Sequence, residues 1–215
     1  MKELPFKPPA MIFDLDGTLL DTEPLYSEAA QAVLDPYGYV FSRELKRRII
    51  GGDSLKGAKM TVEEYDLPIS AEEFLTRRKI HLDKLFPTAA EIEGAGEFLT
   101  YISKKGVAPG LATSSNMLHC DMKIGHRTWR PLLRTVVCGD DPELKRSKPE
   151  PDIFLLCAAR MSVDPAETIA FEDSKNGVLA AKAAGMTVIA ISSPYIGPGD
   201  LDQADIVVDN FRELM

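Results

Sequence analysis

The chain has 215 residues, which is enough for one large domain or for one domain with a modest insertion. Hydrophobic residues make up 45% of it and charged residues 27%, as in an ordinary soluble globular protein. The formal net charge of −8 argues against nucleic acid or an anionic membrane as the main partner, so an anionic substrate would need a locally positive pocket.

Cysteine usage and hydropathy give a second set of expectations. Cys120, Cys138 and Cys157 share no metal-binding spacing and lie in apolar patterns, so we expect reduced thiols in the core. Residues 1–9 contain no apolar segment of signal-peptide length, and no later stretch approaches the roughly 18 apolar residues of a membrane-spanning helix. We therefore expect a cytoplasmic protein, for which a monomer needs no extra assumption.

The first chemical signal lies near the N-terminus, where the apolar stretch Ala10–Phe13 is followed by Asp14 and Asp16. Residues at positions i and i+2 of an extended segment point to the same side, so both carboxylates can reach one metal ion and one phosphorus atom. Gly17 then lets the chain turn sharply. This pattern predicts a reaction site at the end of a buried strand.

Residues 21–87 contain several helical patterns and no convincing strand. The signals that begin or end these helices are Pro24 before an amphipathic segment 25–34, Ser42 before 43–50, a capping box at Ser70, and Pro87 after Phe86. We predict a helical cap subdomain over 21–87, inserted into a core formed by 1–20 and 88–215.

From Pro109 onward, apolar strand-like runs alternate with helical patterns. These runs are 110–113, 135–138, 168–172 and 187–191. The alternation predicts βαβ units, and therefore an α/β fold with a parallel sheet. The strand at 10–14 has the same continuous apolar character and is expected to lie centrally in that sheet.

Ligands of open α/β sheets bind beyond the carboxyl ends of the strands. Asp14 ends the first predicted strand, the Thr113–Ser115 run ends the next, and Glu172 with Asp173 ends a third. Lys148 lies in a connection that begins after a fourth strand. Four polar groups that are distant in the sequence are thus expected at one edge of the sheet.

Phosphate monoesters resist hydrolysis strongly, so a catalyst for them must offset a large barrier. Asp14 can attack phosphorus and form an aspartyl-phosphate, which splits that barrier into two smaller steps. Asp16 can protonate the departing alkoxide and later deprotonate the attacking water. Lys148 would supply positive charge to the phosphoryl oxygens, and the Thr113 hydroxyl with neighbouring amides would supply donors.

Two carboxylates that face a phosphoryl group would repel it, so this chemistry requires a divalent cation. Mg²⁺ suits the site because it accepts hard oxygen ligands and takes one or two protein carboxylates together with a substrate oxygen. We expect Asp14 and Asp173 to be its side-chain ligands, with Glu172 nearby and the Asp16 carbonyl completing the shell. Glu172 and Asp173 can also cap the helix that follows them, and the two roles are compatible.

Other polar side chains have simpler interpretations. No chemistry is assigned to the histidines, which show no metal-ligand spacing: His81, His119 and His126. Trp129 is expected to pack in the core rather than to line the site. Lys123 and Lys175 have two open interpretations, since they either add positive potential near the pocket or lie solvated on the surface.

These motifs, in this order, resemble those of the haloacid dehalogenase-like hydrolase superfamily. The DxDGT run at 14–18 resembles its first motif, Thr113 its second, Lys148 before Pro-x-Pro-Asp its third, and residues 171–177 its fourth. The resemblance covers nearly the whole chain. It implies a Rossmann-like core, a small helical cap between the first two motifs, dependence on Mg²⁺ and an aspartyl-phosphate intermediate.

Within the superfamily, the chain is most similar to the sugar-phosphatase and β-phosphoglucomutase branch, and especially to pseudouridine-5′-phosphatase and its relatives. The segments that carry this similarity are 86–90, 113–115, 139–143 and 148–155. The substrate-binding residues that the resemblance implies are Gly17, Glu23, Ser114, Ser115 and Asn116.

Two positions distinguish phosphatases from phosphomutases in this branch. Mutases have a histidine four residues after an Asp-Thr dipeptide, where this chain has Tyr26. They also have a cap arginine after a glycine, which the 51–54 run lacks. Both differences favour a phosphatase.

We therefore predict a Mg²⁺-dependent phosphatase of small phosphorylated metabolites, namely sugar or nucleoside monophosphates such as pseudouridine 5′-phosphate. Two alternatives stay open: a β-phosphoglucomutase-like phosphomutase, and a non-catalytic module that binds a phosphorylated metabolite. Candidate cap residues for selectivity are Asp53, Ser54 and Lys56. No nucleic acid or membrane partner is expected.

Overall fold

The computed structural model of the protein describes residues 4–49 and 54–215. The chain forms two compact units, one made up of the segment up to Asp21 together with Ala90–Met215, the other of Thr22–Ala89. We refer to them as the core unit and the insert unit. The boundaries expected from the sequence, after residues 20 and 87, lie one and two residues from the observed ones.

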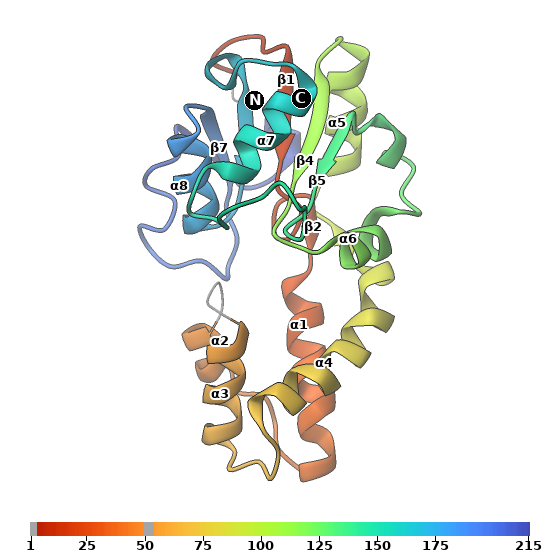
Figure 1. Ribbon diagram of the computed structural model, residues 1–215, viewed down its shortest axis with the longest axis vertical. Coiled ribbons are helices and arrows are strands. Elements are labelled where there is room, and N and C mark those ends of the chain that lie inside the picture. Colours follow the sequence, from red (N-terminus) through yellow and green to blue (C-terminus); the bar gives the residue numbers. More distant parts are fainter. Residues whose placement is uncertain (1–3, 50–53) are drawn as a thin grey trace. The chain divides into compact units, whose positions relative to one another are not determined.

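The core unit contains a six-stranded parallel sheet with the strand order β5-β4-β1-β6-β7-β8 (Figure 1). Its strands are β1 (Ala10–Phe13), β4 (Ala108–Ala112), β5 (Thr135–Val137), β6 (Ile169–Glu172), β7 (Thr187–Ile191) and β8 (Ile206–Val208). β1 is central, since it pairs with β4 on one side and with β6 on the other. The predicted α/β, Rossmann-like class is confirmed, and β8 is an edge strand that the sequence analysis missed.

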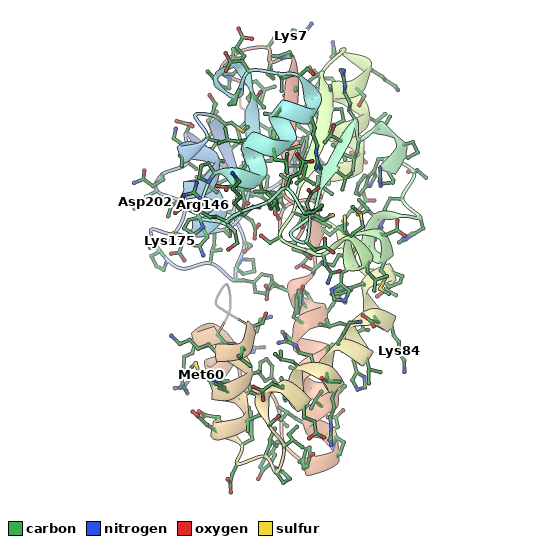
Figure 2. All side chains as sticks on the ribbon, viewed as in Figure 1. Lys7, Met60, Lys84, Arg146, Lys175 and Asp202 are labelled. Carbon is green, nitrogen blue, oxygen red and sulfur yellow. The ribbon has the colours of Figure 1, made fainter. Side chains whose placement is uncertain are left out.

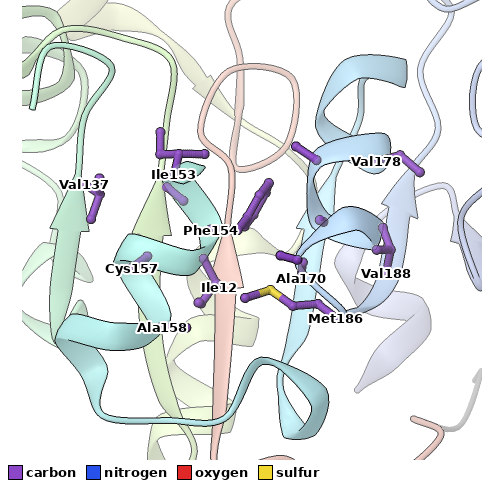
Figure 3. Close-up of a cluster of buried hydrophobic side chains, with 14 of the residues drawn as sticks. Ile12, Val137, Ile153, Phe154, Cys157, Ala158, Ala170, Val178, Met186 and Val188 are labelled. Carbon is purple, nitrogen blue, oxygen red and sulfur yellow. The ribbon is translucent and has the colours of Figure 1, made fainter. Parts of the chain in front are cut away.

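Helices cover the sheet. They are α5 (Ala95–Lys104), α6 (Met117–Ile124), α7 (Asp152–Met161) and α8 (Lys175–Ala183), with short 3-10 turns at Arg130–Leu132, Pro165–Glu167 and Phe211–Leu214. On one face, Ile12 and Ala170 from the strands belong to a buried cluster with Phe154 of α7 and Val178 of α8 (Figure 3). This cluster joins both helices to the centre of the sheet.

The opposite face is closed by aromatic rings. Phe13 of β1 stacks on Phe171 of β6, with 4.6 Å between ring centroids. Phe98 of α5 and Phe211 of the C-terminal 3-10 turn lie within 6.3 Å of both rings. Because both faces of the sheet are covered, β1 has a continuous apolar sequence rather than an alternating one.

Backbone hydrogen bonds extend beyond the ends of the central strands. The Asp14 N–H donates to the Phe171 carbonyl at 2.9 Å, one residue past the end of β1. The Thr113 N–H donates to the Val137 carbonyl at 3.0 Å, one residue past the end of β4. The first polar residue after each strand is therefore held by the sheet itself.

A small antiparallel pair lies where the chain leaves and rejoins the core unit. It consists of β2 (Leu20–Asp21) and β3 (Ala90–Glu91). The sequence analysis predicted neither strand, because two residues are too few to show an alternating pattern.

The insert unit is helical, as predicted. Its elements are α1 (Glu23–Leu34), α2 (Arg43–Ile49), α3 (Ser54–Glu64) and α4 (Ala71–Leu85), with 3-10 turns at Asp35–Tyr37 and Phe86–Thr88. Two predicted caps are confirmed. The Ser42 hydroxyl accepts from the Leu45 N–H at 3.1 Å, and the Ser70 hydroxyl accepts from the Glu73 N–H at 3.1 Å.

The insert unit has an apolar core of its own. Its buried members come from α1, α3, α4 and the segment before α4: Ala30, Val33, Leu34, Ala58, Leu67, Ala71 and Phe74. The helix predicted over 43–50 is observed as α2, and residue 50 lies outside the described residues.

Two further expectations concern membranes and thiols. Within 4–49 and 54–215, no helix combines the length and the apolar character needed to cross a bilayer. Cys120, Cys138 and Cys157 are buried and free of disulfide bonds, which confirms the expected core thiols. Cys157 lies in the cluster between α7 and the sheet (Figure 3).

The aromatic face predicts a large stability loss on truncation. Phe211→Ala removes a fully buried ring that packs against three others, so unfolding should become easier by about 3–5 kcal/mol. Urea unfolding followed by tryptophan fluorescence measures the change. Leu155→Ala, at a side chain of α7 that is 40% exposed, is the control and should lose about 1 kcal/mol or less. Equal losses would contradict this account of the core.

Candidate active site

Three acidic side chains meet where β1 and β6 end. Asp14 follows β1, Glu172 ends β6 and Asp173 follows it. Among the described residues, they form one group in which a carboxylate oxygen from each lies within 4.8 Å of the others. Since β1 and β6 are neighbours in register, the sheet itself brings these side chains together.

Lys148 lies among these acids. Its Nζ donates to Asp14 Oδ1 at 2.6 Å, to Glu172 Oε1 at 2.5 Å and to the Ala112 carbonyl at 3.2 Å. The side chain is only 7% exposed, and the Lys148–Pro149 peptide bond is cis. The loop between β5 and α7 thus delivers a cation to the ends of β1, β4 and β6.

Glu172 anchors both this lysine and the start of α8. Its Oε2 accepts from the N–H groups of Asp173 and Ser174, at 3.0 and 3.2 Å, and from the Ser174 hydroxyl at 3.1 Å. The N-cap of α8 is Ser174, whose hydroxyl accepts from the Gly177 N–H at 3.1 Å. A Cβ at Gly177 would overlap the Glu172 carboxyl, so glycine is required there.

The turn after β1 holds Asp173. The hydroxyl of Thr18, which is buried, donates to Asp173 Oδ1 at 3.0 Å. Gly17 has a φ of +87°, and a Cβ there would overlap the Asp173 carboxylate. The predicted sharp turn is therefore present, and it also leaves room for an acid from the neighbouring strand.

Crowding in this buried site shifts the acid–base equilibria. Burial raises the pKa of Asp14 to about 7, an effect that the charge of Lys148 opposes and the charges of Glu172 and Asp16 reinforce. Burial, with the negative charges of Glu172 and Asp14, raises the pKa of Asp173 well above its usual value. Burial alone would lower the pKa of Lys148, but its two acidic partners raise it, so the lysine keeps its proton.

The acidic group fits a divalent cation. Its donors are hard carboxylate oxygens, the ligands that divalent cations such as Mg²⁺ prefer. Asp14 and Asp173 are the side chains that we propose as ligands. Glu172, the third acid, has oxygens engaged by Lys148 and by the turn before α8. The expected role of the Asp16 carbonyl stays a prediction.

Asp16 lies in a second polar group. Its Oδ1 accepts from Lys123 Nζ at 2.5 Å, and its Oδ2 accepts from the Ser115 hydroxyl at 2.7 Å. Lys123 also donates to Ser115 Oγ at 2.8 Å and is fully buried. The solvated interpretation of Lys123 is therefore wrong, whereas Lys175 is exposed at the start of α8 (Figure 2).

A sequence signal for Lys123 did exist. The buried residues of α6 are Cys120, Lys123 and Ile124, so this lysine lies at helical spacing on the face that packs against the core. A charge at such a position needs a partner. The sequence alone does not show that the partner is Asp16.

The loop after β4 contains further predicted site residues that belong to the core unit. Thr113 is buried, and its Oγ1 accepts from the Ser115 N–H at 3.1 Å. Ser114 is exposed and lines a pocket of about 170 Å³ with Lys148. Asn116 caps α6, since its Oδ1 accepts from the His119 N–H at 2.8 Å. Of the substrate-binding residues predicted in this loop, Ser114 is the most exposed.

Trp129 packs as expected. It is 3% exposed, and its Nε1 donates to Glu91 Oε1 at 2.7 Å. The exposed His126 and the half-buried His81 and His119 lie outside the acidic group. The structure therefore gives no reason to assign chemistry to the histidines.

The predicted cap residues lie in the insert unit. Glu23 begins α1, with its Oε2 3.9 Å from Lys46 Nζ. Tyr26 packs edge-on against Phe86, with 5.8 Å between ring centroids. Of the three selectivity candidates, Ser54 and Lys56 belong to α3, and Asp53 lies outside the described residues.

Comparisons with known proteins agree with the motifs. Residues 11–191 match the haloacid dehalogenase-like hydrolase family. The chain is 38% identical to (DL)-glycerol-3-phosphatase 2 of Arabidopsis thaliana, over 92% of this chain and 85% of that protein. It is 39% identical to a protein of Drosophila melanogaster named "Probable pseudouridine-5'-phosphatase", over 94% and 89%.

Solved structures show the same architecture. A Thermotoga maritima structure provisionally described as a beta-phosphoglucomutase has a TM-score of 0.81 and 33% identity, with 93% of each chain covered. The resemblance inferred from the four motifs is confirmed by these matches.

The crowded acids predict an unusual pH dependence of stability in the metal-free protein. The pKa of Asp14 is about 7 in the folded protein against an ordinary 3.8, so between these values the folded state holds a proton that the unfolded chain has lost. The free energy of unfolding must then fall as the pH rises through this range. Asp14→Asn removes the titrating group and should weaken the fall.

Urea unfolding in the presence of EDTA, at about pH 5 and about pH 8, measures this effect as a difference between wild type and Asp14→Asn. The wild type should lose more stability than the variant at the higher pH. Equal changes in both proteins would contradict the raised pKa. Added Mg²⁺ should stabilise the wild type more at the higher pH, because the cation then displaces fewer protons.

Proposed function

This chain belongs to the haloacid dehalogenase-like hydrolase family, and we propose that it hydrolyses phosphomonoesters of small metabolites with Mg²⁺ and a phosphorylated Asp14. It is a phosphoric monoester hydrolase of that family. One observation carries the finer proposal: the buried Asp14 carboxylate lies at a strand end, bonded to Lys148 and within reach of Asp173.

The relatives support the class of substrate. Their names specify a glycerol phosphatase, a pseudouridine-5′-phosphatase and, in Thermotoga maritima, a phosphorylated carbohydrates phosphatase. The substrates that these names imply are small alcohols or sugars esterified to phosphate. We propose a sugar, polyol or nucleoside monophosphate as the substrate of this chain. A cytoplasmic location and a monomeric state stay predictions.

In the first half-reaction, a carboxylate oxygen of Asp14 forms a bond to phosphorus while the bond from phosphorus to the ester oxygen breaks. Asp16 gives a proton to the departing alkoxide. Lys148 stays charged because Asp14 and Glu172 surround it, and it offsets negative charge on the phosphoryl oxygens.

In the second half-reaction, water attacks the phosphorus of the acyl phosphate and releases the Asp14 carboxylate together with inorganic phosphate. Asp16 accepts the proton of that water, which restores the starting state. Mg²⁺ held by Asp14 and Asp173, with Glu172 alongside, would offset the repulsion between the acids and the phosphoryl group.

Backbone N–H groups that already form hydrogen bonds limit the contacts that a substrate can make. The Gly17 N–H donates to the Leu20 carbonyl, and the Ser115 N–H donates to Thr113 Oγ1, so a phosphoryl group would have to exchange with these bonds. We propose Ser114 as the first contact, with Gly17, Ser115 and Asn116 lining the same site. Glu23 is proposed to face a substrate hydroxyl.

Replacing the nucleophile should end turnover. Asp14→Asn is expected to lower the rate of phosphate release by about 10⁴-fold or more, because the covalent route is lost. Release from a panel of polyol, sugar and nucleoside phosphates, with Mg²⁺ and with EDTA, is the measurement. Asp202→Asn, at an exposed acid, is the control and should keep full activity. Full turnover by Asp14→Asn would overturn the nucleophile assignment.

Replacing the acid should discriminate between leaving groups. Asp16→Ala is expected to slow hydrolysis of alkyl phosphates by about 10²-fold to 10⁴-fold, and that of p-nitrophenyl phosphate much less, because a phenolate needs little proton donation. Steady-state kinetics on both substrates give the ratio. Equal losses on the two would count against the acid role.

The phosphomutase alternative has its own test. A hexose 1-phosphate is incubated with the enzyme and Mg²⁺, and the isomer and free phosphate are followed together. Tyr26, in place of the mutase histidine, favours faster release of phosphate. Isomer formation that outpaces phosphate release would replace the phosphatase assignment with the mutase.

A further inference from the structure

The buried Lys123 is the second cation of the site, and the phosphatase mechanism above gives it no role. Its side chain is fully buried. A lysine is rarely buried unless a partner compensates its charge. Its Nζ lies 2.5 Å from Asp16 Oδ1 and 2.8 Å from Ser115 Oγ. The partner is thus the acid that is proposed to move protons.

The three side chains form a closed triangle of hydrogen bonds. Lys123 donates to Asp16 and to Ser115, and the Ser115 hydroxyl donates to the other Asp16 oxygen at 2.7 Å. Both carboxylate oxygens of Asp16 are therefore held. Rotation of the carboxyl group about its Cβ–Cγ bond would break two charge-assisted contacts at once.

Each corner of the triangle comes from a different element. Asp16 lies in the turn after β1, Ser115 in the loop after β4, and Lys123 on α6. α6 is itself fixed by its Asn116 cap and by Arg127 Nε, which donates to the Lys123 carbonyl at 3.2 Å. The ammonium group is therefore delivered from a packed helix rather than from a mobile surface.

The Asp16 side chain is less enclosed than the lysine that holds it. It is 24% exposed, whereas Lys123 is 0% exposed. The hydrogen bonds from Lys123 and Ser115 thus hold the carboxyl group, while part of the Asp16 side chain stays accessible to solvent. This is the arrangement expected of a proton-transfer group whose orientation is fixed by supporting hydrogen bonds from its neighbours.

We propose that Lys123 is a positioning residue for Asp16, and that it acts with Ser115 to hold the carboxyl in the orientation from which protons pass to and from the reacting oxygens. This inference rests on the proposed function. The proposal predicts a selective effect on catalysis, because a loss of Lys123 should affect only the steps that use Asp16.

Lys123→Met tests the proposal, since methionine fills a similar volume without the charge. The kcat on an alkyl phosphate should fall by about 10-fold to 100-fold, with KM little changed and a smaller loss on p-nitrophenyl phosphate. This is the leaving-group pattern of Asp16→Ala in a weaker form. Ser115→Ala should show the same pattern to a lesser degree.

A double-mutant cycle makes the test specific to the pair. If Lys123 acts through Asp16, the Asp16→Ala/Lys123→Met variant should be no more than about 2-fold slower than Asp16→Ala alone. Losses that multiply would overturn the proposal. Lys104→Met, which removes an exposed charge at the end of α5, is the matched control and should keep full activity.

Two further readouts separate positioning from folding. A crystal structure of Lys123→Met should show the Asp16 carboxyl turned away from its wild-type orientation, and an unchanged carboxyl would overturn the proposal. A lowered unfolding midpoint with equal losses on both substrates would indicate a purely structural lysine and would also overturn it. Failure of the proposed function itself would appear separately, as an inactive wild type or an active Asp14→Asn.

Discussion

The constraint on which the site depends is the crowding of carboxylates at the ends of two neighbouring strands. Asp14, Glu172 and Asp173 approach one another where β1 and β6 end, and Lys148, which hydrogen-bonds to Asp14 and Glu172, offsets part of their mutual repulsion. Burial, together with the negative charges of the neighbouring acids, raises the pKa values of Asp14 and Asp173. The strands that carry these acids keep them close together despite their electrostatic repulsion.

The fold can impose this crowding because both faces of the sheet are packed. The Phe13–Phe171 stack lies on one face and the α7/α8 cluster on the other, so β1 and β6 cannot separate to relieve the repulsion. The residues after each strand are fixed by further backbone bonds, such as that from the Asp14 N–H to the Phe171 carbonyl. Positions with little spare volume, at Gly17 and Gly177, then admit the neighbouring carboxylates. Packing thus supplies the rigidity that a preorganised site requires.

The sequence predicted the residues that follow directly from the end of a strand. Asp14, Thr113 and Glu172 each close an apolar run, and parallel strands bring their carboxyl ends to one edge, so their convergence could be inferred without coordinates. Lys123 could not be assigned in the same way. Its position on α6 shows that it is buried, but the partner depends on how that helix packs across the sheet end, which no local pattern records. The strands β2 and β3 were missed because each has only two residues, too few to show an alternating pattern.

The two buried lysines divide the acids between them. Lys148 bonds Asp14 and Glu172, whereas Lys123 bonds Asp16, so the proposed nucleophile and the proposed proton-transfer group each have a separate cation. When all four carboxylates are ionised, the two ammonium groups leave two negative charges uncompensated, and the chain as a whole carries a net charge of −8. A third buried lysine would cancel only one of these charges. A divalent cation matches the deficit in magnitude and can share its ligands with the phosphoryl group. The charge balance of the site therefore favours metal-assisted phosphate chemistry in an otherwise acidic protein.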